Sequence, residues 1–167
     1  MTIKAGEKLP AGELSEYIEE ETAGCTIGPN KFKVDDITRG KKIVIFGLPG
    51  AFTPTCSAKH VPSYLQNLER LKAKGVSDVI CMAVNDAFVM GAWARDQKTA
   101  GKVRMLGDGS AAFTQAVGLP LDLTANGMGV RSQRYSVLVV DGVVKTLNVE
   151  KPGAFEVSSA DAMLKAL

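Results

Sequence analysis

The residues best suited to chemistry lie in one short segment that ends in a cysteine. Residues 49–56, PGAFTPTC, directly follow an apolar run at 43–48 that predicts a strand buried on both faces. Thr53 is a good N-cap and Pro54 suits the first helical position, so Cys56 falls in the first turn of a helix. Unpaired backbone N–H groups and the helix dipole favour a thiolate there. Because the thiolate is the nucleophilic form, Cys56 is predicted to do covalent chemistry.

A plain structural cysteine is the alternative for Cys56, because free cysteines often pack as small apolar side chains. The strand, turn and helix start around it favour the reactive thiol, and Thr53 lies beside the sulfur even if it is only a cap. His60, the only histidine, lies one helical turn further along the same face. It can tune the thiolate or bond the backbone. A cysteine hydrolase is disfavoured, because its base histidine must reach the sulfur and His60 shares the helix of Cys56.

Composition sets the broad class of the protein. The 167 residues predict a single domain over 1–167, and a net charge of +2 with 6% aromatic residues argues against a nucleic-acid partner. Three cysteines without a CxxC pair predict no disulfide scaffold and no metal site. The N-terminus lacks a signal-peptide pattern and the apolar runs are short, so we expect a cytoplasmic protein with no membrane contact.

The periodicity along the chain predicts a mixed α/β sheet. A second buried strand is expected at 79–84, followed by a helix capped by Asn85 or Asp86. Asp141-Gly142 predicts a hairpin between strands at 134–140 and 143–149. The remaining expected elements are a helix over 53–74 kinked or offset at Pro62, a strand at 103–106, a helix at 110–117 and a last helix from Ser158 or Ser159. Helices on both faces of a central mixed sheet correspond to a thioredoxin-like fold.

Several of these segments carry a family resemblance. Pro49-x-x-x-Thr53-x-x-Cys56 resembles the active-site motif of the peroxiredoxins. The longer run FGLPGAFTPTCSxxHxP and VNDAF at 84–88 resemble the type II, peroxiredoxin-five-like subgroup. RYSVLVVDG at 134–142 and LNVE at 147–150 are similar to the C-terminal half of that subgroup. The resemblance therefore covers nearly the whole chain.

The resemblance implies a thiol peroxidase that reduces hydrogen peroxide and organic hydroperoxides. Cys56 would attack the O–O bond and become a sulfenic acid. Thr53, backbone N–H groups and an arginine would stabilise the charge on the leaving oxygen. The local match assigns that arginine to Arg134, with Arg131 as the residue that could be confused with it. Pro49 would shield the sulfur from solvent.

The sequence leaves open how the sulfenic acid is reduced. Cys81 follows Cys56 by a spacing that resembles plant and bacterial members of the subgroup, so it is a possible resolving cysteine. It also lies in a predicted buried strand, which favours a core cysteine and reduction by glutathione and glutaredoxin. A disulfide between Cys56 and Cys81 would favour thioredoxin instead. Cys25 receives no role, and no bound cofactor is expected beyond the external thiol reductant.

The sequence is also compatible with a different class of function. A thioredoxin-fold redox sensor or interaction module would use Cys56 only as a switch, but such a switch does not need Thr53 and Arg134 beside the sulfur. The resemblance further implies a homodimer packed near the active-site face. Phe52, Phe88 and Trp93 are available for that contact or for the core.

Overall fold

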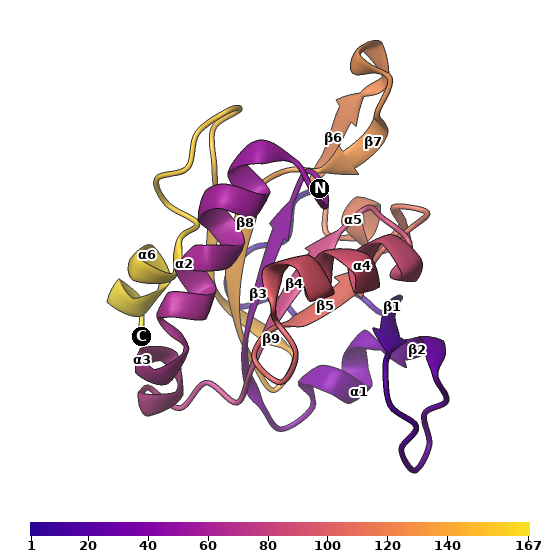
Figure 1. Ribbon diagram of the computed structural model, residues 1–167. Coiled ribbons are helices and arrows are strands. Elements are labelled where there is room, and N and C mark those ends of the chain that lie inside the picture. Colours follow the sequence, from indigo (N-terminus) through magenta and orange to yellow (C-terminus); the bar gives the residue numbers. More distant parts are fainter.

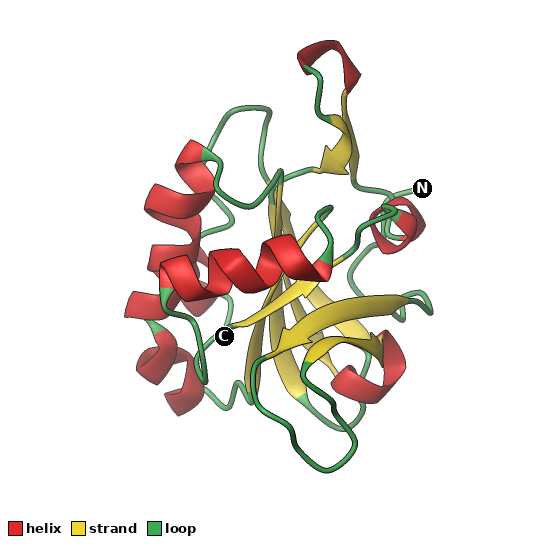
Figure 2. Cartoon of the chain, turned by 45° about the vertical axis from the view of Figure 1, so that its right-hand side comes forward, coloured by secondary structure: helices red, strands yellow, loops and turns green.

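One seven-stranded mixed sheet runs through the molecule, and helices lie on both of its faces (Figure 1, Figure 2). The computed structural model describes residues 1–167. The strands lie in the order β2-β1-β5-β4-β3-β8-β9. This arrangement confirms the predicted fold class. The strands are β1 (Glu13–Ile18), β2 (Gly28–Lys33), β3 (Lys42–Leu48), β4 (Asp78–Ala83), β5 (Arg104–Gly107), β8 (Tyr135–Val140) and β9 (Val143–Val149).

The centre of the sheet is parallel and its flanks are antiparallel. β3 pairs parallel with β4, and β4 pairs parallel with β5. β8 pairs antiparallel with β3, and β1 pairs antiparallel with β5. β3 is buried on both faces, with Phe46 in one core cluster and Ile45 in the other, as its unbroken apolar run predicts.

Six helices cover the two faces of the sheet. Four of them contribute buried residues to the core cluster that contains Cys56, and two pack on the opposite cluster. The first group is α2 (Val61–Gln66), α3 (Leu68–Ala73), α4 (Ala87–Gln97) and α6 (Ala160–Lys165), and the second is α1 (Val34–Thr38) and α5 (Ala112–Ala116). Asp86 caps α4 and Ser159 caps α6 through their side chains, in agreement with the sequence.

The helix predicted over 53–74 is not continuous. A π-helical turn, η1 (Cys56–His60), precedes α2. The helix is interrupted a second time at Asn67, before α3. Pro62 explains the first irregularity. It has no N–H to donate to the carbonyl four residues earlier, so the ladder of the helix is interrupted at that point. The offset expected at Pro62 is thus present, but as a widened turn that includes Cys56.

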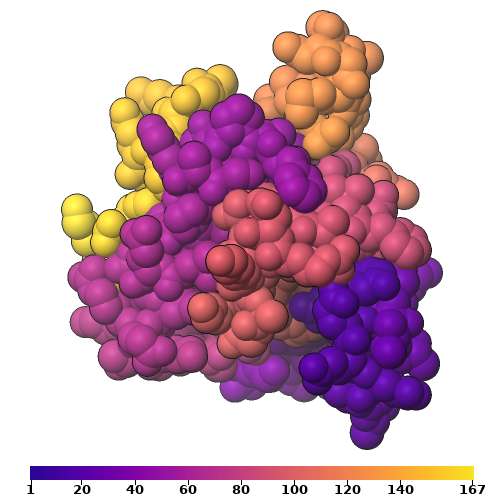
Figure 3. Space-filling view, viewed as in Figure 1, coloured from indigo at the N-terminus to yellow at the C-terminus, as the bar shows by residue number.

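Two parts of the chain that carried no predicted elements are also ordered. The first is the N-terminal β1, β2 and α1. The second is a hairpin of β6 (Pro120–Leu123) and β7 (Gly129–Ser132), joined by η2 (Thr124–Asn126), which forms a separate two-stranded sheet. This hairpin stands out from the body of the molecule near the start of α2 (Figure 1, Figure 3).

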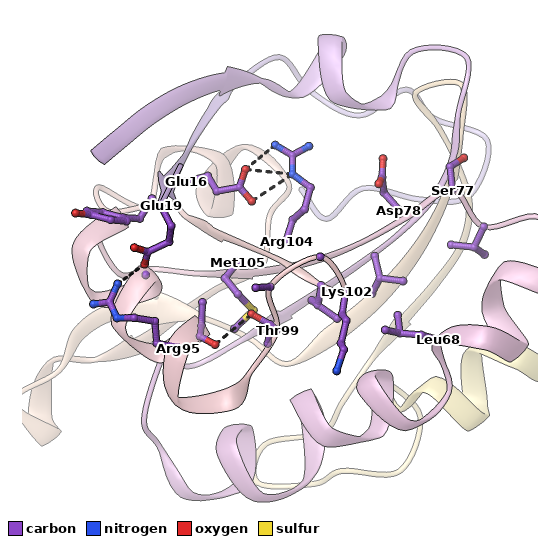
Figure 4. A pocket seen from close by; sticks show the side chains of 18 of the residues that line it. Glu16, Glu19, Leu68, Ser77, Asp78, Arg95, Thr99, Lys102, Arg104 and Met105 are labelled. Atoms are coloured by element: carbon purple, nitrogen blue, oxygen red, sulfur yellow. Dashed lines mark hydrogen bonds and ion pairs between the residues drawn. The ribbon is translucent and has the colours of Figure 1, made fainter. Parts of the chain in front are cut away.

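A hollow of about 370 Å³ lies at the starts of β4 and β5, against the C-terminal end of α4 (Figure 4). Arg104 pairs with Glu16 and Arg95 pairs with Glu19 inside it, so most of its charges are already partnered. Cys56 follows the opposite, C-terminal end of β3, so this hollow is not part of the cysteine site. No helix has the length and apolar character needed to cross a membrane.

Candidate active site

Cys56 lies in the irregular first turns of the helix that follows β3. The helix begins at Pro54, and Ser57 donates its N–H to the Thr53 carbonyl at 3.0 Å. The next turn is wider, because Val61 donates to the carbonyl of Cys56 five residues earlier. Insertions of this type in helices are frequent at functional sites. The sulfur therefore sits at the helix start, as predicted, but on a π-helical turn.

Arg134 is the arginine that reaches the sulfur. Its Nη2 donates a hydrogen bond to Cys56 Sγ at 3.2 Å. The register of the sheet makes this possible, because Gly47 near the end of β3 lies opposite Tyr135 at the start of β8. Arg134 precedes Tyr135 and so lies beside the chain that leaves β3. Arg131 instead donates to the Pro49 carbonyl at 3.2 Å, which resolves the ambiguity between the two arginines.

His60 holds the other side of the Arg134 guanidinium. Its Nε2 lies 3.1 Å from the Ser158 carbonyl and its Nδ1 lies 2.9 Å from Arg134 Nη1. A carbonyl and a guanidinium can both be satisfied only if Nε2 carries the proton and Nδ1 accepts. Burial, and then the charge of Arg134, lower the pKa of His60 to about 3. His60 is therefore a neutral acceptor that orients Arg134, not a base for Cys56.

Glu150 and Ser158 extend this chain of contacts, and the sequence analysis assigned neither a role in the site. Glu150 Oε2 accepts four hydrogen bonds from residues 156–158, including 2.7 Å from the Ser158 hydroxyl. Burial alone would raise the pKa of Glu150, but these hydrogen bonds outweigh burial and hold it below its ordinary value of 4.5. The carboxylate thus fixes the segment whose carbonyl orients His60. The only signal in the sequence was Glu150 at the end of the LNVE segment.

Thr53 lies beside the site in an arrangement that differs from the expected one. Its hydroxyl donates to the Gly50 carbonyl at 2.7 Å, and no helix N–H bonds to this side chain. The expectation of a side-chain cap is therefore wrong, because the hydroxyl turns back toward the preceding loop. With its proton committed, the Thr53 oxygen has only lone pairs left for a substrate. It is suited to accept from a peroxide O–H, whereas the family resemblance implies a donor.

Cys56 is buried, and a hollow is lined by its sequence neighbour Thr55 and its partner Arg134. The residue is 0% exposed. A hollow of about 280 Å³ opens beside it, lined by Pro49 and Thr55 on one side and by Arg134 and residues 150–154 on the other. Pro49 is half-buried at this rim, where it can limit the access of water to the sulfur.

The other two cysteines differ from Cys56 in their surroundings. Cys81 lies in the middle of β4, is 0% exposed and belongs to the same core cluster as Cys56. Burial, and then the charge of Cys56, raise the pKa of Cys81 well above its ordinary value, with Arg134 opposing. Cys25 is half-buried in the loop between β1 and β2, and Figure 1 shows this loop on the opposite side of the molecule from the segment that follows β3. All three are free thiols.

A buried cysteine sulfur at a helix start, bonded to a fixed guanidinium on a mixed sheet of this topology, is typical of thiol-based redox enzymes of the redoxin class. The redoxin family model matches residues 4–164 of the chain. Peroxiredoxin-2B of Arabidopsis thaliana is 45% identical over 165 residues, which cover 99% of this chain and 98% of that protein. The chain therefore belongs to the peroxiredoxin family, in its type II subgroup, and is a thiol-dependent peroxidase.

Two solved structures agree with this assignment of fold. Reduced Prx3 of Vibrio vulnificus in complex with hydrogen peroxide is 47% identical, with a TM-score of 0.90 over 99% of both chains. A Burkholderia cenocepacia protein described as a thioredoxin reductase is 58% identical, with a TM-score of 0.98 over 100% of this chain and 99% of that one. This chain has no CxxC pair, and its site matches the peroxiredoxin motif.

Proposed function

We propose that Cys56 is the peroxidatic cysteine and that Arg134 is its charged partner. The thiolate attacks one oxygen of the peroxide, the O–O bond breaks, and Cys56 becomes a sulfenic acid. The departing oxygen leaves as an alcohol or water after it takes a proton. The contact of 3.2 Å between Arg134 Nη2 and Cys56 Sγ carries this proposal. It places a permanent positive charge beside the thiolate and beside the oxygen that becomes negative as the O–O bond breaks.

His60 and Thr53 complete the arrangement around the reacting atoms. His60 accepts from Arg134 Nη1 and leaves Nη2 pointed at the sulfur. Thr53 offers an oxygen lone pair to the peroxide O–H, because its own proton is donated to the Gly50 carbonyl. The two groups therefore act on different partners: His60 orients the guanidinium, and Thr53 orients the peroxide. Such fixed dipoles stabilise a transition state without reorganisation during the reaction.

The hollow beside the site supports a substrate range that includes organic hydroperoxides as well as hydrogen peroxide. Its volume of about 280 Å³ exceeds what hydrogen peroxide requires, since one water occupies about 30 Å³ in the liquid. Leu121, Pro152 and Ala154 supply apolar contacts on its wall, next to the cationic Arg134. An organic substituent can occupy this space while the peroxide group faces the sulfur.

Glutathione together with glutaredoxin is the proposed reductant. Cys81 is fully buried in a strand that is paired on both sides, and its raised pKa keeps it a neutral thiol. A disulfide requires two Cα atoms within about 7 Å and suitable side-chain directions, so its formation here would displace packed core residues. Cys56 is itself 0% exposed, so an external thiol requires the turn over Cys56 to open, but it leaves the paired strand β4 in place. Thioredoxin is the competing reductant and requires the disulfide between Cys56 and Cys81.

We also propose a cytoplasmic homodimer with an interface near the active-site face. Phe52 is 54% exposed and Phe88 is 64% exposed, whereas Trp93 is fully buried. Trp93 is therefore a core residue, and the two phenylalanines are the apolar side chains left for a partner copy. Sedimentation of the wild type and of Phe88→Glu tests the interface. A dimer that dissociates in the variant supports it, and a wild type that sediments as a monomer contradicts it.

Steady-state turnover of peroxide with each reductant tests the proposed reaction. The wild type should consume hydrogen peroxide with glutathione and glutaredoxin, and Cys56→Ser should have no activity. Cys25→Ser is the matched control, because it also removes one thiol but lies far from the site. Activity that survives in Cys56→Ser, or that is lost in Cys25→Ser, would contradict the assignment.

A further inference from the structure

Residues 49–51, named here the crossing loop, connect β3 to the helix of Cys56, and each is held by one side chain. Its first carbonyl accepts from Arg131 Nη1 at 3.2 Å, and its second carbonyl accepts from the Thr53 hydroxyl at 2.7 Å. Its last N–H donates to Asn85 Oδ1 at 2.9 Å. Arg131 belongs to β7 and Asn85 follows β4, so two elements remote in sequence fix the backbone that enters the active site.

These side chains converge on Gly50. A Cβ atom at this position would lie 2.5 Å from Arg131 Nη1, 3.5 Å from Thr53 Cγ2 and 3.6 Å from Asn85 Oδ1. The first distance is shorter than any ordinary contact, so only glycine allows Arg131 to approach this closely. A Cβ atom at residue 50 would therefore push Arg131 Nη1 away from the crossing loop.

Arg131 is itself fixed from the other side. Its Nε donates to the Met128 carbonyl at 2.9 Å, within the β6–β7 hairpin. The planar guanidinium thus connects two backbone carbonyls, one in the hairpin and one in the crossing loop. This contact joins the hairpin, which stands out from the body in Figure 3, to the active site.

The residue after the crossing loop has a strained backbone. Phe52 has a φ of 62°, in the left-handed region that a bulky side chain rarely occupies. Such a conformation persists only where neighbouring contacts enforce it, and strained residues of this type concentrate at functional sites. The contacts from Asn85 and Arg131 lie directly before Phe52, and Thr53 comes directly after it.

We propose that Asn85 and Arg131 are positioning residues for the peroxidase reaction, because together they hold the crossing loop in the conformation that places Pro49 and Thr53 over Cys56. The inference rests on the proposed roles of Cys56 and Thr53. Neither Asn85 nor Arg131 bonds to the sulfur. Both act through the backbone of the crossing loop.

The contact pattern separates this role from the activation of the sulfur. The Gly50 carbonyl belongs to the same peptide group as the Ala51 N–H that Asn85 holds, and it accepts the Thr53 proton, so release of the loop reorients the Thr53 oxygen. The contact between Arg134 and Cys56 joins the residue before β8 to the helix, and it does not pass through the loop. Loss of the contacts from Asn85 or Arg131 should therefore slow the reaction with peroxide, because that reaction needs an oriented Thr53. The reaction with an alkylating agent does not need Thr53 and should be slowed less.

The test compares those two reactions in the reduced full-length protein. Trp93 is the only tryptophan and its Nε1 donates to Ser57 Oγ at 3.1 Å, so its fluorescence can follow oxidation of Cys56 in a stopped-flow instrument. Asn85→Ala and Arg131→Met should each slow the reaction with hydrogen peroxide by about 10- to 100-fold, the size of effect that small displacements in an active site produce. The rate of alkylation of Cys56 by iodoacetamide should change far less.

A conservative replacement provides the rescue. Asn85→Asp keeps an oxygen for the loop N–H, and the Asn85 amide nitrogen makes no hydrogen bond that would be lost. Its peroxide rate should return close to that of the wild type. Asn126→Ala, at the exposed tip of the same hairpin, and Arg39→Met, an exposed arginine far from the site, are the matched controls and should react like the wild type.

Urea unfolding of every variant shows whether it is folded, and only folded variants are compared. Wild-type peroxide rates in folded Asn85→Ala and Arg131→Met would overturn the proposal. Equal losses in the peroxide and alkylation rates would also overturn it, because they would place the effect on the sulfur itself. If Asn85→Asp does not restore the rate, the hydrogen bond from the crossing loop to Asn85 is not what positions the loop. If the wild type itself does not react with peroxide, the proposed function fails instead.

Discussion

His60 is predicted to make the protein lose stability in mild acid, by an amount that follows from its surroundings. The ring is 0% exposed and bonded as a neutral group between the Ser158 carbonyl and Arg134. Its pKa is lowered from 6.5 in the unfolded chain to about 3 in the fold, first by burial and then by the charge of Arg134. Below pH 6.5 the unfolded chain therefore binds a proton at His60 that the folded protein does not bind. The contribution of the neutral ring to the free energy of unfolding is complete above pH 6.5 and is lost as the pH falls toward 3.

The magnitude follows from the linkage between proton binding and stability. One proton bound only by the unfolded state lowers the free energy of unfolding by about 1.4 kcal/mol per pH unit. Glu150 has an ordinary pKa of 4.5 that the fold lowers, so its own contribution is lost only below that pH. Between pH 6.5, where the unfolded histidine is half protonated, and pH 4.5, His60 should account for roughly 2 kcal/mol.

The assay is urea unfolding at several pH values, at one fixed protein concentration in case the chain dimerises. His60→Gln is the comparison variant, because its amide can donate to the Ser158 carbonyl and accept from Arg134 without titrating. The wild type should lose roughly 2 kcal/mol more than His60→Gln between pH 6.5 and 4.5. If both proteins lose the same stability over this interval, the neutral buried histidine is refuted.

Four further predictions follow from the same contacts. Arg134→Ala should lower the rate of reaction with peroxide by about 100-fold or more, and Arg134→Lys should recover only part of it, as stopped-flow measurements will show. Thr53→Val should slow that reaction by about 10- to 100-fold, since it removes the acceptor, and should cost about 1 kcal/mol in urea unfolding, since it also removes the hydrogen bond to the Gly50 carbonyl. Cys81→Ala should retain full turnover with glutathione and glutaredoxin, and a large loss would assign Cys81 to resolution. Gly47→Ala should destabilise the protein by about 3 kcal/mol in urea unfolding, because its Cβ would lie 2.2 Å from the Tyr135 ring.

The central sheet and the position of Cys56 were predictable because their signals are local. The β-branched run at 43–48, the Asp141-Gly142 turn and the Thr53-Pro54 helix start each report on a few neighbouring residues. The same local chemistry is the basis for the prediction that Cys56 is a reactive thiol.

The N-terminal strands and the β6–β7 hairpin were not predicted from the sequence, and for the N-terminal strands the reason is physical. β2 reads GPNKFK, and its glycine, proline and asparagine indicate a turn when the partner strand is unknown. Strand β1 is mostly half-exposed and polar, as an outer strand can be, so it shows no apolar alternation. The two strands depend on pairing with each other, and β1 also pairs with β5.

Contacts around the sulfur depended on the tertiary structure in the same way. Arg131 and Arg134 are equivalent in local chemistry, and only the register of β8 against β3 decides which one reaches Cys56. The direction of the Thr53 hydroxyl depends on where the Gly50 carbonyl is held. The role of Glu150 depends on a segment that folds back onto it. Such long-range arrangements leave no periodic signal in the chain.

Intact mass after brief exposure to one equivalent of peroxide tests the central claim most directly. The reduced wild type, with no other thiol present, should gain one oxygen atom as the Cys56 sulfenic acid, and Cys56→Ser should gain none. A wild type of unchanged mass, or an equal gain in Cys56→Ser, would contradict Cys56 as the peroxidatic residue. Loss of two hydrogens in the wild type would keep Cys56 but contradict reduction by an external thiol, since it would show an internal disulfide with Cys81.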